Sequence, residues 1–136
     1  MRKLILMLLL AFASSNASAQ FAKWTVIDRR ETFSIYADTA SVRRSGNIVQ
    51  MWDMSDAAPG KVLGGVKQSA SSKMEREYDC GKQQLRMLYV SWHSGHMGEG
   101  EIIGSDSNPG VWQMALLGTI GERLWKIACG ESRRYF

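Results

Sequence analysis

The sequence predicts a single small α+β domain, in which a mainly antiparallel sheet of about five to six strands packs against a C-terminal helix and one or two short helices. Three observations lead to this fold class. Segments of alternating apolar and polar residues are separated by Gly, Asn, Asp and Pro, and one amphipathic segment lies near the end of the chain. The 136 residues contain no repeat, low-complexity tract or linker, which is typical of one domain.

Five strands are expected from the alternation, at residues 23–28, 32–37, 48–54, 66–79 and 84–92. Trp24 and Val26 share one face of the first strand. A turn from Asp38 to Ser41 is expected to follow the second, and the sequence Ser45-Gly46-Asn47 is a turn signal before the third. A loop that contains Pro59 and several glycines precedes the fourth.

The two later strands differ in the polarity of their faces. In the fourth, one face is charged and the other, which ends at Cys80, is expected to point inward; the charged residues are Lys73, Glu75, Glu77 and Asp79, and the inward ones are Met74, Tyr78 and Cys80. In the fifth, Leu85, Met87 and Tyr89 oppose Leu88, Val90 and Trp92. Because both faces are partly apolar, this strand is predicted to be central and covered on two sides, one of which could be a partner subunit.

Residues 119–129 form the clearest helix. The sequence Thr119-Ile120-Gly121-Glu122 matches a capping box, in which the Thr hydroxyl and the Glu carboxylate satisfy free backbone amides of the first turn. At 100° per residue, Leu124, Trp125 and Ala128 fall on one apolar arc, with Cys129 at its edge.

The N-terminus reads as a cleavable secretion signal at residues 1–19, followed by a domain at residues 20–136. Arg2 and Lys3 precede an apolar run at 4–12 that is too short to span a bilayer, and Ala17-Ser18-Ala19 is typical of a cleavage site. A membrane anchor is the alternative. No cysteine follows the apolar run, so lipid anchoring is not expected, and no later segment is apolar enough to span a membrane. The chain is therefore expected in the periplasm, at the cell surface or outside the cell.

Cys80 and Cys129 are the two cysteines of the chain. An even cysteine number behind an export signal predicts one disulfide, here between the end of the fourth strand and the last helix. The alternative, a reactive thiol, would require a nearby histidine, and neither cysteine has one close in sequence. Loss of Arg2 and Lys3 with the signal would lower the net charge from +4 to +2. With acidic and basic residues interspersed, this argues against nucleic acid as a partner.

Two groups of side chains are candidate functional sites. His93 and His96, with Glu99 or Glu101, could bind a divalent metal, but two histidines in a glycine-rich loop are a weak signal, and a solvated loop is the favoured interpretation. No cofactor or catalytic residue is predicted. Trp24, Trp52 and Trp125 are expected in the core. Trp92 and Trp112 are the candidate recognition surface, and the alternative for them is a lid over the end of the sheet.

The order of short motifs resembles the surface-adhesin protein E-like domain of Gram-negative envelope proteins. The motifs are Trp24, Tyr36-Ala37-Asp38, Gly46 to Trp52, Glu77 to Cys80, Gly98-Glu99-Gly100, Trp112, and Gly121-Glu122 to Ala128-Cys129. Leu117-Gly118-Thr119 departs from the Pro-Gly-Ser-like turn of the pattern, although Thr can still cap the helix. The resemblance implies a disulfide-linked sheet and helix in an exported protein, adhesion to extracellular-matrix or serum proteins, and a homodimer. No adhesive-site residue of the family matches a motif here.

Three hypotheses of function follow. The first is an exported, non-catalytic binding protein of the adhesin type, which would require a sizeable exposed patch. The second is a periplasmic accessory or structural protein without an external ligand. The third is a small metal-dependent hydrolase that uses His93 and His96, whose side chains would have to converge in a pocket.

Overall fold

The computed structural model describes residues 22–63 and 68–130. The expected signal peptide at residues 1–19, its cleavage after Ala19, and residues 66 and 67 at the start of the expected fourth strand lie outside the described residues. Within the described part of the chain, no helix is both long and apolar enough to cross a membrane.

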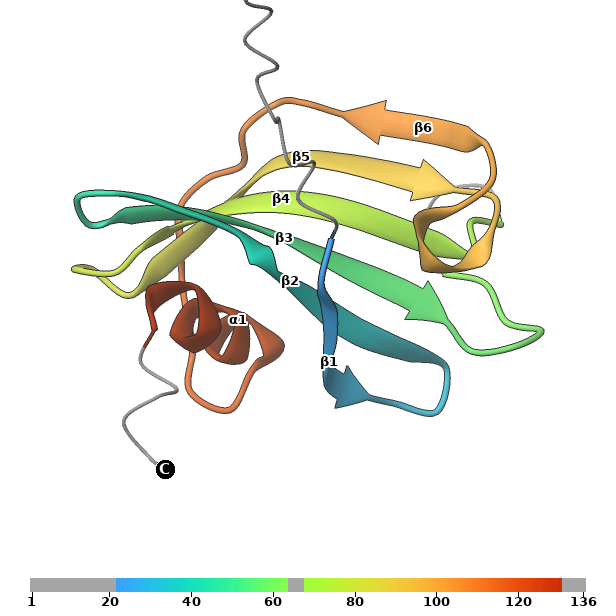
Figure 1. Ribbon diagram of the computed structural model, residues 1–136, viewed down its shortest axis with the longest axis horizontal. Helices are drawn as coiled ribbons and strands as arrows, with labels where there is room; N and C mark the ends of the chain where they lie inside the picture. The colour runs from blue at the N-terminus through green and yellow to red at the C-terminus, as the bar shows by residue number, and fades with distance from the viewer. Residues whose placement is uncertain (1–21, 64–67, 131–136) are drawn as a thin grey trace, which may run out of the picture.

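One antiparallel sheet forms most of the domain, and its first six strands pair in the order in which they occur in the chain. They are β1 (Trp24–Arg29), β2 (Phe33–Ser45), β3 (Ile48–Ala57), β4 (Ser71–Asp79), β5 (Gln84–His93) and β6 (Ile102–Asp106). The two-residue strand β7 (Gln113–Met114) pairs with the start of β5. Figure 1 shows the twisted sheet with the helix α1 on one of its faces. The α+β fold class is confirmed.

The predicted end of the second strand at Ala37 is wrong, because β2 continues to Ser45. The expected turn from Asp38 to Ser41 is a bulge instead, and the register with β3 shifts between Asp38 and Arg43. The Asp38 carboxylate accepts hydrogen bonds from the backbone N–H groups of Ala40 and Lys23, at 3.0 and 2.8 Å. The bulge interrupts the strand without ending it, since β3 supplies partners on both sides of it.

Strand β4 begins at Ser71, after the predicted start, and its predicted faces are confirmed: Tyr78 is fully buried beneath α1. In β5, the predicted strict alternation fails. The register changes by one residue, so that Met87 lies opposite Arg76 and Tyr89 lies opposite Glu75. Leu88 is the extra residue of this bulge. As a result, Tyr89 joins the face away from the helix, while Val90 and Trp92 lie on the helix side.

The helix α1 (Ile120–Cys129) buries Leu124, Trp125 and Ala128 against the sheet. The sheet contributes Ala37, Val49, Met51, Tyr78 and Leu85 to the same core. The Thr119 hydroxyl oxygen accepts a hydrogen bond from the Glu122 N–H at 3.2 Å, as predicted. The Glu122 carboxylate accepts from the Gly118 N–H at 3.4 Å, one residue before the expected amide. The helix ends at Gly130, whose φ of 77° favours glycine.

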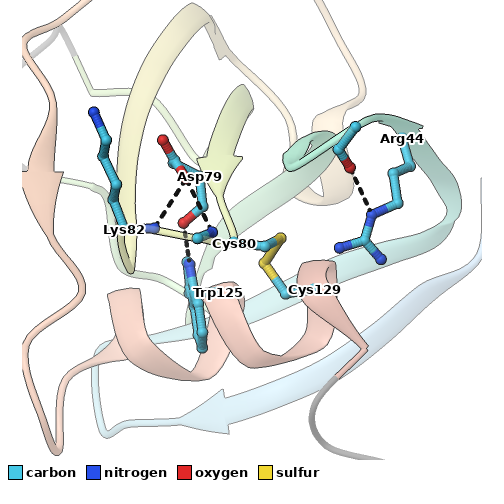
Figure 2. The surroundings of a disulfide bond; sticks show 8 residues. Arg44, Asp79, Cys80, Lys82, Trp125 and Cys129 are labelled. Carbon is cyan, nitrogen blue, oxygen red and sulfur yellow. Dashed lines mark hydrogen bonds between the residues drawn. A yellow bond between two sulfur atoms is a disulfide. The ribbon is translucent and has the colours of Figure 1, made fainter.

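Two links fasten the helix to the end of β4 (Figure 2). Cys80 and Cys129 form the predicted disulfide, with their Cα atoms 5.7 Å apart. One turn earlier on the helix, the Trp125 indole N–H donates to the Asp79 carbonyl oxygen at 2.9 Å. The sheet and the helix are therefore joined at one place by a covalent bond and by a hydrogen bond.

Besides α1, the described residues contain one short helical turn, η1 (His96–Gly98), where one or two short helices were expected. It lies against β3, β4 and β5. The Ser71 hydroxyl donates to the Gly95 carbonyl at 2.6 Å and accepts from the Gly98 N–H at 2.8 Å. Since Ser71 is on the face away from α1, this turn covers one end of that opposite face.

Removal of the disulfide is expected to lower the free energy of unfolding substantially. The disulfide joins residues 49 positions apart and thereby restricts the unfolded chain. This restriction stabilises the folded state by about 4 kcal/mol, which is lost when the disulfide is removed. The measurement is urea unfolding of a Cys80→Ala/Cys129→Ala variant, followed by circular dichroism. Wild type reduced with dithiothreitol is the matched control and should unfold at a similar midpoint. Equal midpoints for oxidised wild type and the variant would contradict the expected contribution.

Candidate functional site

Trp92 lines a cavity on the helix side of the sheet, at the end that α1 does not reach. The cavity has a volume of about 380 Å³, and it is lined by Trp92, Phe33, Val62, Leu63 and the hydroxyl-bearing residues Thr32, Ser55 and Ser72. Trp92 is half-buried, and Arg30 lies over the Phe33 ring with 5.7 Å between the guanidinium carbon and the ring centroid. Aromatic, aliphatic and hydroxyl groups in one depression could accept an apolar side chain of a partner.

Trp112 lies in the segment between β6 and β7, which runs along the outer edge of β5. The Arg86 guanidinium stacks over its ring, with 4.8 Å between the guanidinium carbon and the ring centroid. Arg86 also forms an ion pair with Glu77 on the neighbouring strand. The ion pair holds the guanidinium, and the guanidinium covers the indole of Trp112, which is half-buried.

Four exposed apolar side chains surround Trp112 in sequence. We call them the apolar strip: Val111, Met114, Leu116 and Leu117, with exposed fractions of 77%, 55%, 62% and 88%. Such a concentration of large apolar side chains at the surface is typical of an interaction site. The sequence pattern did not identify this strip, because short apolar runs near glycines also occur in cores.

The structure does not bring Trp92 and Trp112 together. Trp92 lies six positions after Arg86 on β5, a distance of about 20 Å along an extended strand. The two side chains also lie toward different faces, since Trp92 shares the helix side with Ser72, whereas Arg86 pairs with Glu77 on the opposite side. They form two separate candidate surfaces.

A charged pair that sequence reasoning missed lies on the helix side. The Arg76 Nε donates to the Asp53 carboxylate at 2.7 Å, and the Asp53 side chain is 4% exposed. Burial raises the pKa of Asp53, against the opposing charge and hydrogen bond of Arg76. Burial also disfavours the charged guanidinium, but the Asp53 carboxylate raises the pKa of Arg76 overall. Separated by 23 residues, the two give no local signal in the sequence.

Tyr78 lies two residues beyond Arg76 on the same face of β4. It is fully buried, and its hydroxyl has no hydrogen-bond partner among the described residues. Burial holds the pKa of Tyr78 well above its ordinary value, and the charge of Asp53 adds to this. Asp53, Arg76 and Tyr78 thus place polar groups beside the apolar core, and burial of the unpartnered Tyr78 hydroxyl lowers stability.

The two histidines have different surroundings and do not converge. His93 is buried, with its Nε2 2.8 Å from the Ser91 hydroxyl oxygen, and its Nδ1 has no partner in the described structure. His96 is about half exposed, and its Nδ1 lies 3.2 Å from the Asp56 carboxylate. Glu99 and Glu101 are exposed. Over residues 22–63 and 68–130, no group of three or more His, Cys, Asp or Glu side chains could hold a metal ion.

Of the three tryptophans that are predicted to lie in the core, one lies there and two do not. Trp125 is buried beneath the sheet, as predicted. Trp52 instead lies on the face away from α1, half-buried, where it packs edge-on against Tyr89 at 5.8 Å between ring centroids. Trp24 shares that face, since its partner Asp38 also pairs with Trp52. The bulge in β5 explains the Trp52–Tyr89 pair, because strict alternation would place Tyr89 under the helix.

The family model for surface-adhesin protein E matches residues 24–130. The chain belongs to the surface-adhesin protein E family. This assignment covers every described helix and strand, and it supports a surface adhesin-like role. The comparison with curated protein sequences gave no match.

Solved structures of protein E from Haemophilus influenzae share the fold. One crystal form has 14% sequence identity and a TM-score of 0.58, and the match covers 79% of this chain and 94% of that one. A selenomethionine form has the same identity and TM-score and covers 85% and 100%. Protein E from a non-typeable strain has 12% identity, a TM-score of 0.51, and coverage of 83% and 88%. At such identities the likeness shows the fold alone.

His93 is expected to make stability depend on pH. Burial lowers the pKa of His93, and the positive charge of Lys73 adds to this. The folded protein therefore binds the proton less readily than the unfolded chain, in which the pKa is about 6.5. The stabilising contribution of the neutral ring is complete above that pH and is lost as the pH falls below it.

The measurement is the free energy of unfolding between about pH 7.5 and pH 5. His93→Gln is expected to show a smaller loss toward acid than wild type does. His96→Gln changes an exposed histidine three residues later, in η1, and is the matched control, which should keep most of the wild-type dependence. An unchanged pH dependence in His93→Gln would contradict the assignment.

Proposed function

We propose that this protein is an exported, non-catalytic binding protein that attaches to an extracellular protein. Membership of the surface-adhesin protein E family supports export and adhesion. The observation that carries the proposal is the apolar strip, whose residues flank Trp112 in the chain, together with the Arg86–Trp112 stack. Exposed apolar side chains together with a Trp and an Arg have the composition of binding hot spots in protein interfaces.

Trp112 and the apolar strip form the main contact surface, and the cavity at Trp92 is a second one. The Trp112 surface lies on a segment that is anchored at several points. Gly110 N–H donates to the Met87 carbonyl at 2.8 Å, and Ala115 N–H donates to the Gln83 carbonyl at 2.9 Å. Because these bonds tie the segment to the edge of the sheet, the apolar strip is presented in a defined shape, which lowers the entropic cost of binding.

Separate alanine variants at Trp112 and Trp92 test the proposal. The purified, disulfide-bonded protein is applied to immobilised extracellular-matrix and serum proteins, and affinity is measured by surface plasmon resonance. Trp112→Ala is expected to weaken binding more than about tenfold, as loss of a hot-spot aromatic does. A parallel loss in Trp92→Ala would show a partner that spans both surfaces.

Ile102→Ala is the control, since Ile102 is also a large apolar side chain at the surface, 60% exposed, but lies on β6. It should bind like wild type. Thermal unfolding of each variant separates loss of contact from loss of fold. Absence of binding by wild type to any extracellular protein, or full binding by both tryptophan variants, would contradict the proposal. A protein pool confined to the periplasm would favour the accessory role instead.

A further inference from the structure

Two neighbouring cavities, one on the helix side of the sheet and one at the edge of β5, share Arg76, Leu85 and Gln113. The larger, of about 420 Å³, extends toward the start of α1, and the smaller, of about 290 Å³, extends toward Met87 and Gly110. We call the two together the Arg76 groove. Arg76 belongs to both cavities, so a charged residue lies where they meet.

The walls of the Arg76 groove are mainly apolar. Ile35, Leu85 and Leu124 line the deep part of the larger cavity, and Leu116 and Met114 stand at its rim. Val111 lines the smaller cavity. Three members of the apolar strip are thus also groove residues, and each is more than half exposed. A ligand that fills the groove would bury apolar surface on both sides of Arg76.

Arg76 gives the groove its chemical selectivity. Its Nε is bonded to Asp53, and this is the one side-chain hydrogen bond of the guanidinium among the described residues. An arginine carries five N–H donors in a fixed plane, and this geometry fits a carboxylate. Its side chain remains 25% exposed, whereas that of Asp53 is 4% exposed, so the arginine is the member of the pair that a ligand can reach.

We propose that the Arg76 groove binds an extended peptide segment of another protein, with a Glu or Asp side chain on Arg76 and an apolar side chain in each cavity. An internal acidic residue fits better than a chain terminus, because cavities continue on both sides of Arg76. Alternate side chains of an extended peptide point the same way, about 7 Å apart, which suits an apolar–acidic–apolar pattern at every second residue. This inference rests on the proposed function and names the chemistry of the partner.

Charge balance favours one carboxylate over a polyanion. Arg76 is already paired with Asp53, and Arg86, which lines the smaller cavity, is paired with Glu77. A phosphate chain or nucleic acid would need several uncompensated cations along the groove. A single carboxylate needs only the free donors of Arg76, and the apolar walls supply the rest of the binding energy.

A capped peptide, acetyl-Gly-Leu-Ser-Glu-Ser-Leu-Gly-amide, is the probe, and its Glu→Gln counterpart is the matched control. Titration is followed by NMR of the disulfide-bonded protein. Saturable shifts are expected at Leu85, Gln113 and Leu116. The Gln peptide is expected to bind about tenfold more weakly, since it lacks the charge-assisted bonds to the guanidinium. Equal affinity for the two peptides, or shifts elsewhere on the protein, would overturn the proposal.

Two adjacent substitutions provide the control on the protein side. Leu116→Glu places a carboxylate at the rim of the groove and is expected to weaken binding of the Glu peptide more than about tenfold. Leu117→Glu adds the same charge one residue later, at a side chain that is 88% exposed and lines neither cavity. The affinity of this variant for the Glu peptide should stay within about twofold of that of wild type, because surface substitutions have small effects. Equal effects of the two variants would overturn the proposal.

Direct replacement of Arg76 alone would leave Asp53 buried and unpaired, and this could prevent folding. The double variant Asp53→Leu/Arg76→Met removes both charges together and should keep the fold. It is expected to bind the Glu and Gln peptides equally. Retained preference for the Glu peptide in the folded double variant would overturn the role of Arg76. If this variant does not fold, Leu116→Glu and Leu117→Glu still decide.

The groove and the proposed function can fail independently. Should wild type bind an extracellular protein while Leu116→Glu binds it equally well, the groove assignment is wrong and the proposed function stands. Should the peptide bind as expected while no extracellular protein is captured, the groove stands and adhesion is wrong. Sedimentation is measured alongside. Suppose that wild type is a dimer, that Leu116→Glu is a monomer, and that the peptide does not dissociate the wild-type dimer. The groove is then the contact between two copies of this chain, and the peptide assignment is overturned.

Discussion

The attachment of α1 at the Asp79–Cys80 corner is the constraint on which the rest of the structure depends. The disulfide to Cys129 and the hydrogen bond from Trp125 hold the helix where β4 ends. Ten residues of helix span about 15 Å, whereas the 13 residues of β2 extend over about 43 Å. Among the described residues this is the one α-helix, so it can bury only part of the sheet. Its fixed position decides which part.

The regions beyond the helix carry the features with chemical character. At one end, loop residues and Phe33 close over Trp92 and leave a cavity between aromatic and hydroxyl groups. Near β7, the segment from Gly110 to Leu116 lies along the edge of β5, and the charged pair of Arg76 and Asp53 lies beside the apolar core. Incomplete covering of one sheet face therefore produces both a groove and an exposed apolar rim.

The opposite face is shaped by bulges and not by a helix. Irregular pairing in β2 and β5 bends the sheet and redirects Tyr89 toward Trp52, while η1 closes the end near His93. The fold is shared with Haemophilus influenzae protein E at 14% identity. At that divergence most residues differ although the fold is shared. Recognition chemistry therefore has to be derived from the residues of each chain.

The sequence by itself determined the α+β class, the C-terminal helix with its Thr119 cap, and the pairing of Cys80 with Cys129. The class and the helix rest on short-range periodicity and local hydrogen bonds, which can be seen within a few residues. The pairing rests on the fact that the chain has two cysteines, 49 residues apart. Only the tertiary structure decided the continuation of β2 past Asp38, the bulge at Leu88, the separation of Trp92 from Trp112, and the meeting of Arg76 with Asp53. Each of these depends on pairing between strands distant in sequence, where a shift of one residue reverses the face to which a side chain points.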